Sequence, residues 1–135
     1  MLPETLTLEV VTPERRIVSE TVDAVVLPGT EGSLGVLPGH APLLTSLGAG
    51  ELVFMRKGGK RYLAASGGFA EVLPHRVIVL AETAELAEEV DVEQARRKID
   101  EYRGMARSLP AGADPTVIQA KIAKHLARLA VAGRG

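Results

Sequence analysis

The sequence predicts a β-sandwich or flattened barrel followed by an antiparallel two-helix hairpin, so the chain is mainly β with an α-helical end. Two observations predict this fold. From Thr5 to Ala81 apolar and polar residues alternate, and a turn signal recurs every 8–12 residues. From Asp91 onward the apolar spacing changes to alternating steps of three and four, the period of an amphipathic helix. We therefore expect a β domain over residues 1–87 and a helical hairpin over residues 88–135.

Short strands are expected along the first part of the chain. The pattern starts where Leu6, Leu8 and Val10 alternate with polar residues. A glycine pair at Gly58-Gly59 indicates a tight hairpin, and Gly67-Gly68 indicates a bulge or a close backbone approach. The expected strands cover residues 5–10, 16–21, 22–27, 52–56, 61–65, 69–73 and 77–81.

Between these strands lies a stretch rich in glycine and proline. Residues 27–50 contain six glycines and three prolines, together with apolar residues such as Leu37, Leu43 and Leu44. Glycine permits positive φ angles, and proline does not fit the middle of a sheet. The apolar residues are too numerous for a solvated linker. We expect an ordered, irregular surface loop that serves as a contact surface.

The two helices have clear start and stop signals. Asp91 is a suitable N-cap, and Gln94 completes a capping-box pattern for the first helix. A Leu-Pro-Ala-Gly segment at residues 109–112 ends it, and Asp114-Pro115 starts the second helix. The apolar side of the second helix is expected at Ile118, Ile122, Leu126 and Leu129, with alanines at positions 120, 123, 127 and 130 beside them.

Charge divides between the two regions. Residues 1–90 contain 7 Lys and Arg against 12 Asp and Glu, whereas residues 91–135 contain 9 against 5. Lys121, Lys124 and Arg128 share one face of the second helix, with His125 beside them. This face is either simply solvated or a basic arm that docks on an acidic protein surface. Because the helices are short and half of their seam is alanine, the hairpin is expected to be weakly attached.

Composition and motifs exclude several classes of function. The chain has no cysteine, a net charge of −1 and a pI near 6.3, which argue against disulfides, thiolate chemistry and bulk nucleic-acid binding. No lysine follows Gly29–Gly35 as in a phosphate loop, and His40, His75 and His125 lack ligand spacing. We expect no catalytic site and no metal site. The acidic residues Glu82, Glu85, Glu88 and Glu89 are expected to be solvated. Since no signal peptide or membrane-spanning run is evident, we expect a cytosolic protein that meets a membrane only through a partner.

One motif resembles a known family. Residues 27–45 read LPGTEGSLGVLPGHAPLLT, and residues 66–72 read SGGFAEV. Together with the strand end at residues 79–84 and the helical hairpin, these segments closely resemble the epsilon subunit of bacterial F-type ATP synthases. The match covers nearly the full length. It implies a ten-stranded β-sandwich, a non-catalytic rotor subunit of the proton-driven synthase, and a peripheral place on the cytoplasmic face of the bacterial plasma membrane.

The resemblance also implies partners for particular residues. Glu31, Gly32 and Ser33 would face the ring of c subunits, and His40 and Ala41 would lie near the gamma subunit. In the family the hairpin inhibits ATP hydrolysis when it extends toward the catalytic alpha and beta subunits. Lys121, Lys124 and Arg128 are the residues expected to make that contact.

Some family members bind ATP as a regulatory ligand through an Ile/Leu-Asp-x-x-Arg-Ala motif. Here Asp91 and Ala95 match, but Gln94 replaces the arginine. Losing that cation weakens the expectation of ATP binding, and Lys121, Lys124 and Arg128 are the cations available to compensate for it. Two other functions stay open: a freestanding ligand-binding β-sandwich with a helical lid, and an adaptor whose basic helix binds nucleic acid.

Overall fold

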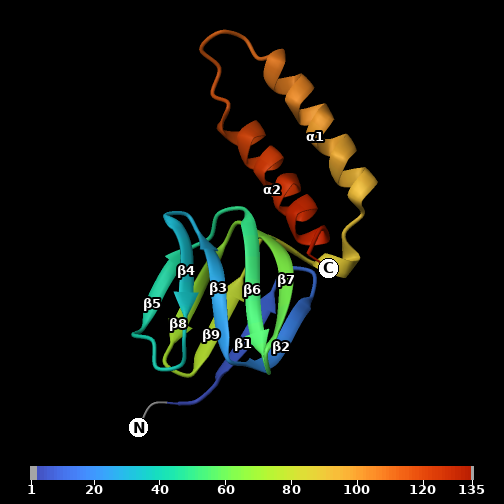
Figure 1. Ribbon diagram of the computed structural model, residues 1–135. Coiled ribbons are helices and arrows are strands. Elements are labelled where there is room, and N and C mark those ends of the chain that lie inside the picture. Colours follow the sequence, from blue (N-terminus) through green and yellow to red (C-terminus); the bar gives the residue numbers. More distant parts are fainter. Residues whose placement is uncertain (1–2, 135) are drawn as a thin grey trace.

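The computed structural model describes residues 3–134 and contains ten strands, one short 3₁₀ helix and two α-helices. The helices follow the strands and project from one end of the β domain (Figure 1). This architecture confirms the predicted sandwich and hairpin. The elements are β1 (Leu6–Val11), β2 (Arg16–Val22), β3 (Ala24–Gly29), β4 (Gly32–Val36), β5 (Leu43–Ser46), β6 (Gly50–Arg56), β7 (Gly59–Ser66), β8 (Phe69–Leu73), β9 (Arg76–Leu80), β10 (Thr83–Leu86), η1 (Ala87–Glu89), α1 (Val92–Arg107) and α2 (Thr116–Ala132).

The strands form two five-stranded sheets that pack face to face. One sheet has the order β2-β1-β9-β8-β5, and the other has the order β10-β7-β6-β3-β4. All pairings are antiparallel except that of β1 with β9. The inner faces meet in one core, because every second residue of a strand points inward. Leu6, Leu8 and Val10 of β1 are fully buried in this way.

Glycine residues occupy two tight places in the backbone, the turn between β6 and β7 and the close approach of Gly68 to β9. Lys57 and Gly58 both have positive φ, and together they form the two-residue turn between β6 and β7. The hairpin was predicted, but its turn lies one residue earlier than the Gly-Gly centre. A Cβ on Gly68 would lie 1.9 Å from the carbonyl oxygen of Leu80. This confirms the close backbone approach expected at Gly67-Gly68.

The glycine- and proline-rich stretch is more regular than predicted. Residues 27–50 contain the end of β3, the whole of β4 and β5, and the start of β6. The expectation of an irregular loop was therefore wrong for β4 and β5. Gly32 and Gly35 lie on β4, an edge strand that tolerates glycine. Pro28 lies on β3 beyond Val26, the last residue of β3 that pairs with β6. The stretch passes from one sheet to the other between β4 and β5.

The helix signals were correct with small shifts. The Asp91 carboxylate accepts the backbone N–H of Gln94 at 3.0 Å, so half of the capping box forms. Asp114 accepts the N–H of Thr116 at 2.9 Å, and α2 begins at Thr116. The expected apolar side of α2 was partly wrong, because Leu126 is 43% exposed. Ala127 is buried as expected, and Val131, which was not expected there, is buried as well, since α2 packs on β6 and β7 as well as on α1.

Candidate functional site

The tip between β3 and β4 carries the residues expected to face the c ring. Glu31, Gly32 and Ser33 are all exposed. Gly32 has a φ of 124°, which a residue with a side chain rarely adopts. Thr30 on the same turn is tied to β5 by its hydroxyl, which lies 2.8 Å from that of Ser46. The tip is thus a well-anchored, solvent-facing protrusion.

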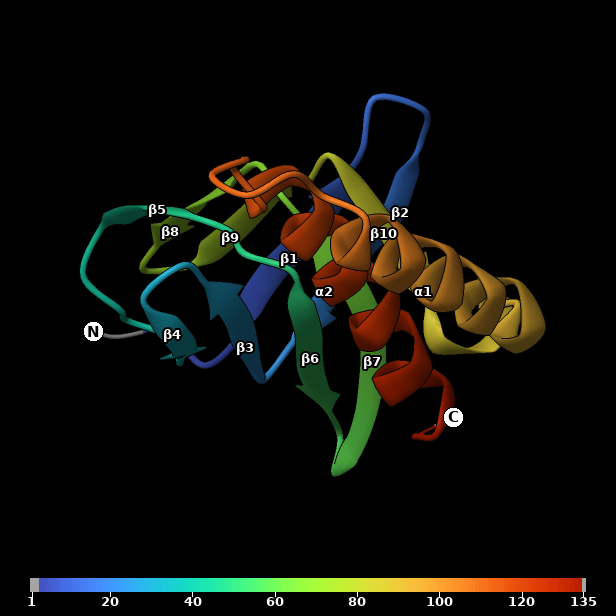
Figure 2. The same ribbon diagram turned by 90° about the horizontal axis from the view of Figure 1, so that it is seen from above.

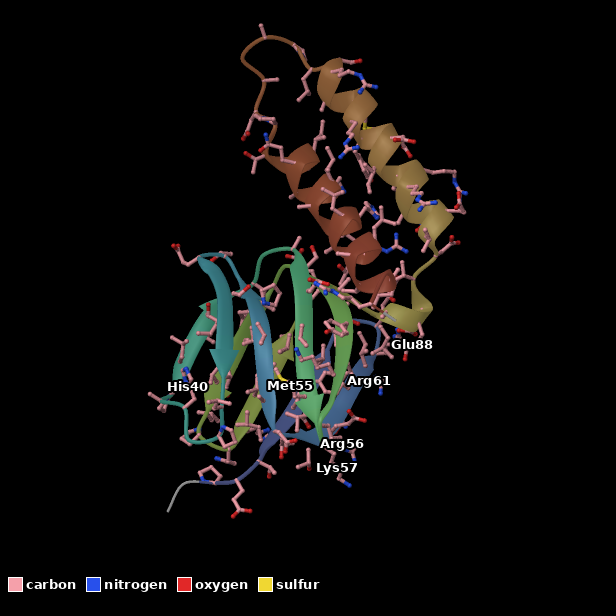
Figure 3. The ribbon with its side chains drawn as sticks, viewed as in Figure 1. His40, Met55, Arg56, Lys57, Arg61 and Glu88 are labelled. Carbon is pink, nitrogen blue, oxygen red and sulfur yellow. The ribbon has the colours of Figure 1, made fainter. Side chains whose placement is uncertain are left out.

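The loop before β5 carries His40 and Ala41. The N–H of Gly39 donates to the carbonyl of Pro74 at 2.7 Å, which ties this loop to the turn between β8 and β9. The ring nitrogen Nδ1 of His40 donates to the carbonyl of Ala41 at 2.7 Å. His40 is half-buried and Ala41 is exposed. Figure 3 shows His40 on the side of the sandwich away from the helices.

An apolar surface lies on the outer face of the sheet that contains β5, β8 and β9. Phe69 on β8 pairs with Leu80 on β9, and they are 47% and 41% exposed. Leu44 on β5 is 67% exposed. Their strand neighbours Ala70, Val72 and Val79 point into the core, so these three side chains point outward. We refer to Leu44, Phe69 and Leu80 as the outer apolar face.

The helical hairpin meets the other sheet through small side chains. A cluster of Ala64 on β7, Ala87 on η1, and Ala127 and Val131 on α2 forms the apolar contact. Seen from above, α2 lies over β7 and α1 lies farther out (Figure 2). Alanine burial contributes little free energy compared with leucine. The apolar part of this junction is therefore weak, as the sequence suggested.

A buried polar cluster supplements the junction. The Arg128 guanidinium donates to the Glu85 carboxylate on β10 at 3.0 and 3.4 Å and to Oε1 of Gln94 on α1 at 2.6 Å. Its side chain is only 10% exposed. The expectation that Arg128 shares a solvent-facing basic face with Lys121 is therefore wrong for this conformation. Instead, Arg128 connects the two helices to the sandwich.

His125 completes this cluster. Its side chain packs beside Arg128 and stacks on the Tyr102 ring of α1 with a centroid distance of 5.9 Å. Burial is the largest cause that lowers the pKa of His125 below its ordinary value, and the charges of Arg128 and Lys124 lower it further. His125 is thus held as a neutral imidazole.

A cleft of about 450 Å³ lies between α2 and the edge of the sandwich. Gln94, Lys124, His125 and Arg128 line it together with the carboxylates of Glu82, Glu85 and Glu89. Of the residues expected to bind ATP, Lys124 and Arg128 contribute to the lining. Asp91 caps α1, and Ala95 is fully buried beneath it. In residues 3–134, no group of acidic and histidine side chains has the arrangement of a metal site.

In the acidic connector Glu82, Glu88 and Glu89 are exposed, as expected, but Glu88 and Glu89 are also paired, and Glu85 is half-buried. Glu88 pairs with Arg61 at 2.9 Å, and these two residues lie side by side in Figure 3. Glu89 pairs with Arg15 at 2.8 Å and accepts the N–H of Leu86. The bond from Arg15 and then the bond from Leu86 lower the pKa of Glu89 below its ordinary value. These pairs fasten η1, where the chain leaves the sandwich, to β7 and to the turn before β2.

The comparisons with known proteins agree with this geometry. Residues 5–87 match the family model described as "ATP synthase, Delta/Epsilon chain, beta-sandwich domain". The chain is 47% identical over 133 residues to the ATP synthase epsilon chain of Solibacter usitatus, which covers 98% of this chain and 99% of that relative. It is 41% identical over 132 residues to the epsilon chain of Nitratidesulfovibrio vulgaris, covering 98% of each. The chain belongs to the ATP synthase delta/epsilon chain family.

Solved structures extend the comparison to the helices. A chain of the Euglena gracilis mitochondrial ATP synthase structure, titled "OSCP/F1/c-ring in rotational state 1", aligns with a TM-score of 0.79 and 28% identity. It covers 100% of this chain and 84% of that one. A chain of the Tetrahymena thermophila ATP synthase aligns with a TM-score of 0.57 and 13% identity, which supports the fold alone. The folded hairpin thus has a counterpart in a solved ATP synthase.

The structure brings some of the basic residues named in the sequence analysis together at the junction and leaves others apart from it. Arg128 binds Gln94 at the junction and Lys124 lines the same cleft, whereas Lys121 is exposed and lies over the Tyr102 ring at 5.7 Å. Sequence reasoning missed the role of Glu85. The sequence contained one signal for this role, the opposite charges of Glu85 and the basic second helix. Because Glu85 and Arg128 are 43 residues apart, the sequence did not show that these two residues pair.

Proposed function

We propose that this chain is a non-catalytic rotor subunit of a bacterial F-type ATP synthase. In this role it couples the proton-driven rotation of the c ring to ATP synthesis through contact with gamma. The full-length similarity to epsilon chains supports the family, and the F1 and c-ring assembly named for the Euglena structure supports the location. The observation that carries the mechanical part is the outer apolar face, which this chain leaves uncovered.

The gamma contact is assigned to the outer apolar face together with His40 and Ala41. Exposed apolar side chains on one sheet face favour a protein partner over solvent. The Gly39 to Pro74 bond fixes the His40 loop at the turn between β8 and β9 of the same sheet. The c-ring contact is assigned to Glu31, Gly32 and Ser33 on the β3–β4 tip. Residues 1–87 would then form the rotor-binding domain.

Co-purification with gamma tests this assignment. Leu44→Glu places a charge in the outer apolar face and is expected to weaken the complex at least tenfold, because burying an unpaired charge is costly. Val117→Glu is a matched control, since Val117 is 66% exposed on α2 and lies outside the sandwich. Equal retention of gamma by wild type and Leu44→Glu would refute the assigned face.

Residues 88–135 are assigned a regulatory role. When the hairpin extends toward the alpha and beta subunits, Lys121, Lys124 and Arg128 would meet acidic residues and inhibit ATP hydrolysis. The thin alanine contact supports a hairpin that can detach. Removing residues 91–135 is expected to raise ATP hydrolysis by the assembled complex without preventing assembly. Unchanged hydrolysis in a fully assembled truncated complex would argue against inhibition.

ATP binding in the cleft stays a prediction with a reduced expectation. Lys124 and Arg128 offer two cations, but Arg128 is already bound to Glu85 and Gln94. Four carboxylates, Glu14, Glu82, Glu85 and Glu89, also line the cleft, and their charge would oppose a triphosphate. We expect calorimetric titration of the isolated chain with ATP to show no saturable signal. A micromolar dissociation constant would reverse this expectation.

The proposal places the subunit at the cytoplasmic face of the plasma membrane, attached through the rotor. None of the helices in the described residues is long and apolar enough to span a bilayer. A freestanding ligand-binding sandwich is less well supported, because large side chains such as Phe54, Leu27 and Leu52 fill the space between the sheets. A nucleic-acid adaptor is less well supported because Arg128 is buried.

A further inference from the structure

His125 occupies the point where both helices and the sandwich come together. It is 7% exposed, and its Nδ1 lies 3.0 Å from Nη1 of Arg128. The same Arg128 side chain binds Glu85 on β10 and Gln94 on α1. His125 is therefore in direct contact with the residue that holds the hairpin closed.

The contact between Arg128 and His125 defines the protonation state of the imidazole ring. A guanidinium group has only hydrogen-bond donors, so Nδ1 of His125 must accept with its lone pair. The ring is consequently neutral, and its proton is on Nε2. A second proton would occupy Nδ1 and turn this hydrogen bond into a contact between two donors.

Cations surround the ring on both helices. Burial lowers the pKa of His125 most, followed by the charges of Arg128, Lys124, Lys98 and Lys121. Tyr102 of α1 covers one face of the ring and has Lys121 on it as well. A protonated His125 would therefore add a positive charge to a cluster that already repels it.

Four carboxylates line the cleft with His125, and two of them already accept hydrogen bonds. Glu85 on β10 accepts two bonds from Arg128. Glu89 on η1 accepts from Arg15. Glu82, which precedes β10, and Glu14, in the turn before β2, also line the cleft. A protonated His125 could recruit Glu85 only in competition with Arg128, which would itself weaken the junction.

The remaining attachment is small enough for one proton to matter. The apolar contact rests on Ala64, Ala87, Ala127 and Val131. Surface ion pairs such as Arg134 with Glu51 add little, because water screens them. The buried Arg128 cluster is the main polar link, so a charge inserted there acts on the whole hairpin.

We propose that His125 is a pH sensor that releases the helical hairpin from the β-sandwich when it takes up a proton. At neutral pH the imidazole accepts from Arg128 and the hairpin stays closed. On acidification the proton enters at Nδ1, Arg128 loses an acceptor, and the closed form is destabilised. This property belongs to the isolated chain, so it does not depend on the proposed rotor role.

The direction with pH follows from the lowered pKa. An opened hairpin exposes His125 and returns its pKa to its ordinary value of 6.5. The contribution of neutral His125 to the stability of the closed form is thus fully present above pH 6.5. This contribution is lost as the pH falls toward the lower pKa that His125 has in the closed form. The ratio of open to closed molecules rises by up to about tenfold for each unit that separates the two pKa values.

Distance measurements by pulsed electron paramagnetic resonance test the sensor. The chain has no cysteine, so Lys60→Cys and Ala111→Cys provide two specific spin-label sites, one on β7 and one in the loop between the helices. We expect the population with altered distance to rise as the pH falls from 8 to 5. His125→Asn keeps an acceptor but does not titrate, and is expected to stay closed throughout.

The controls separate His125 from general acid effects. A His40→Asn, His75→Asn double variant leaves His125 as the remaining histidine and should keep the full pH response. Nuclear magnetic resonance titration of His125 in the unmodified chain gives a readout that needs no variant. A wild-type hairpin that stays closed at pH 5, an equal pH response in His125→Asn, or a His125 pKa at or above 6.5 would each overturn the proposal.

Discussion

The two parts of this molecule are held together in different ways. The sandwich encloses Leu, Val and Phe side chains between two sheets, and large side chains such as Phe54, Leu8 and Leu52 are less than 2% exposed. The hairpin rests on three alanines, one valine and a buried arginine cluster. Aliphatic burial is insensitive to pH and to single charges, whereas a polar cluster depends on every partner being present. The sandwich is thus stable against changes in pH and single charges, whereas the docking of the hairpin depends on the arginine cluster.

The largest predicted effect lies in the sandwich core. Leu8→Ala removes a fully buried side chain from β1 and is expected to lower the free energy of unfolding by about 2–5 kcal/mol, because a cavity remains. Leu126→Ala on α2 changes the same residue type where it is 43% exposed, and should cost less than about 0.5 kcal/mol. Urea unfolding of both variants measures the difference. Equal losses would mean that the two regions do not differ in packing.

An intermediate effect is expected at the junction. Arg128→Met leaves Glu85 without its partner and should weaken docking of the hairpin by about 1–3 kcal/mol. Hydrogen exchange should accelerate in α1 and α2 while the sheet amides keep their protection. Arg103→Met, which removes an exposed arginine of α1, is the control. It should change neither the docking of the hairpin nor hydrogen exchange in the helices. Loss of protection in the sheets as well would show that the regions unfold together.

The smallest effect is expected at Glu89. Its pKa is lowered by Arg15 and by the N–H of Leu86, so ionised Glu89 stabilises the fold above its ordinary pKa of 4.5. That contribution is lost as the pH falls through the lowered value. Glu89→Gln should therefore shift the urea midpoint slightly at pH 7 and not at all at strongly acidic pH. Glu93→Gln alters an exposed pair on α1 and should show no such pH dependence. A shift that persists in acid would contradict the assignment.

Local patterns predicted most of the fold because the signals were short-range. The alternation at Leu6–Val10, the glycine turns and the Asp91 cap each act within a few residues. β4 was missed because its two glycines lower strand propensity, which an edge position tolerates, and β5 was missed because it is an edge strand of only four residues. The burial of Arg128 could not be predicted, since it depends on Glu85 lying 43 residues away in the sequence. The contact roles of Glu31 and His40 stay predictions, because their partners lie on other chains.

The parallel pairing of β1 with β9 affects how the chain is made. β1 occupies an inner place in its sheet, and the neighbour on one side ends only at Leu80. A growing polypeptide therefore has its first apolar strand half-paired until some eighty residues have left the ribosome. Two-stranded hairpins are marginal in water, and long-range pairings form slowly. During synthesis, the β1–β2 hairpin is therefore expected to keep one edge of β1 unpaired until β9 has emerged.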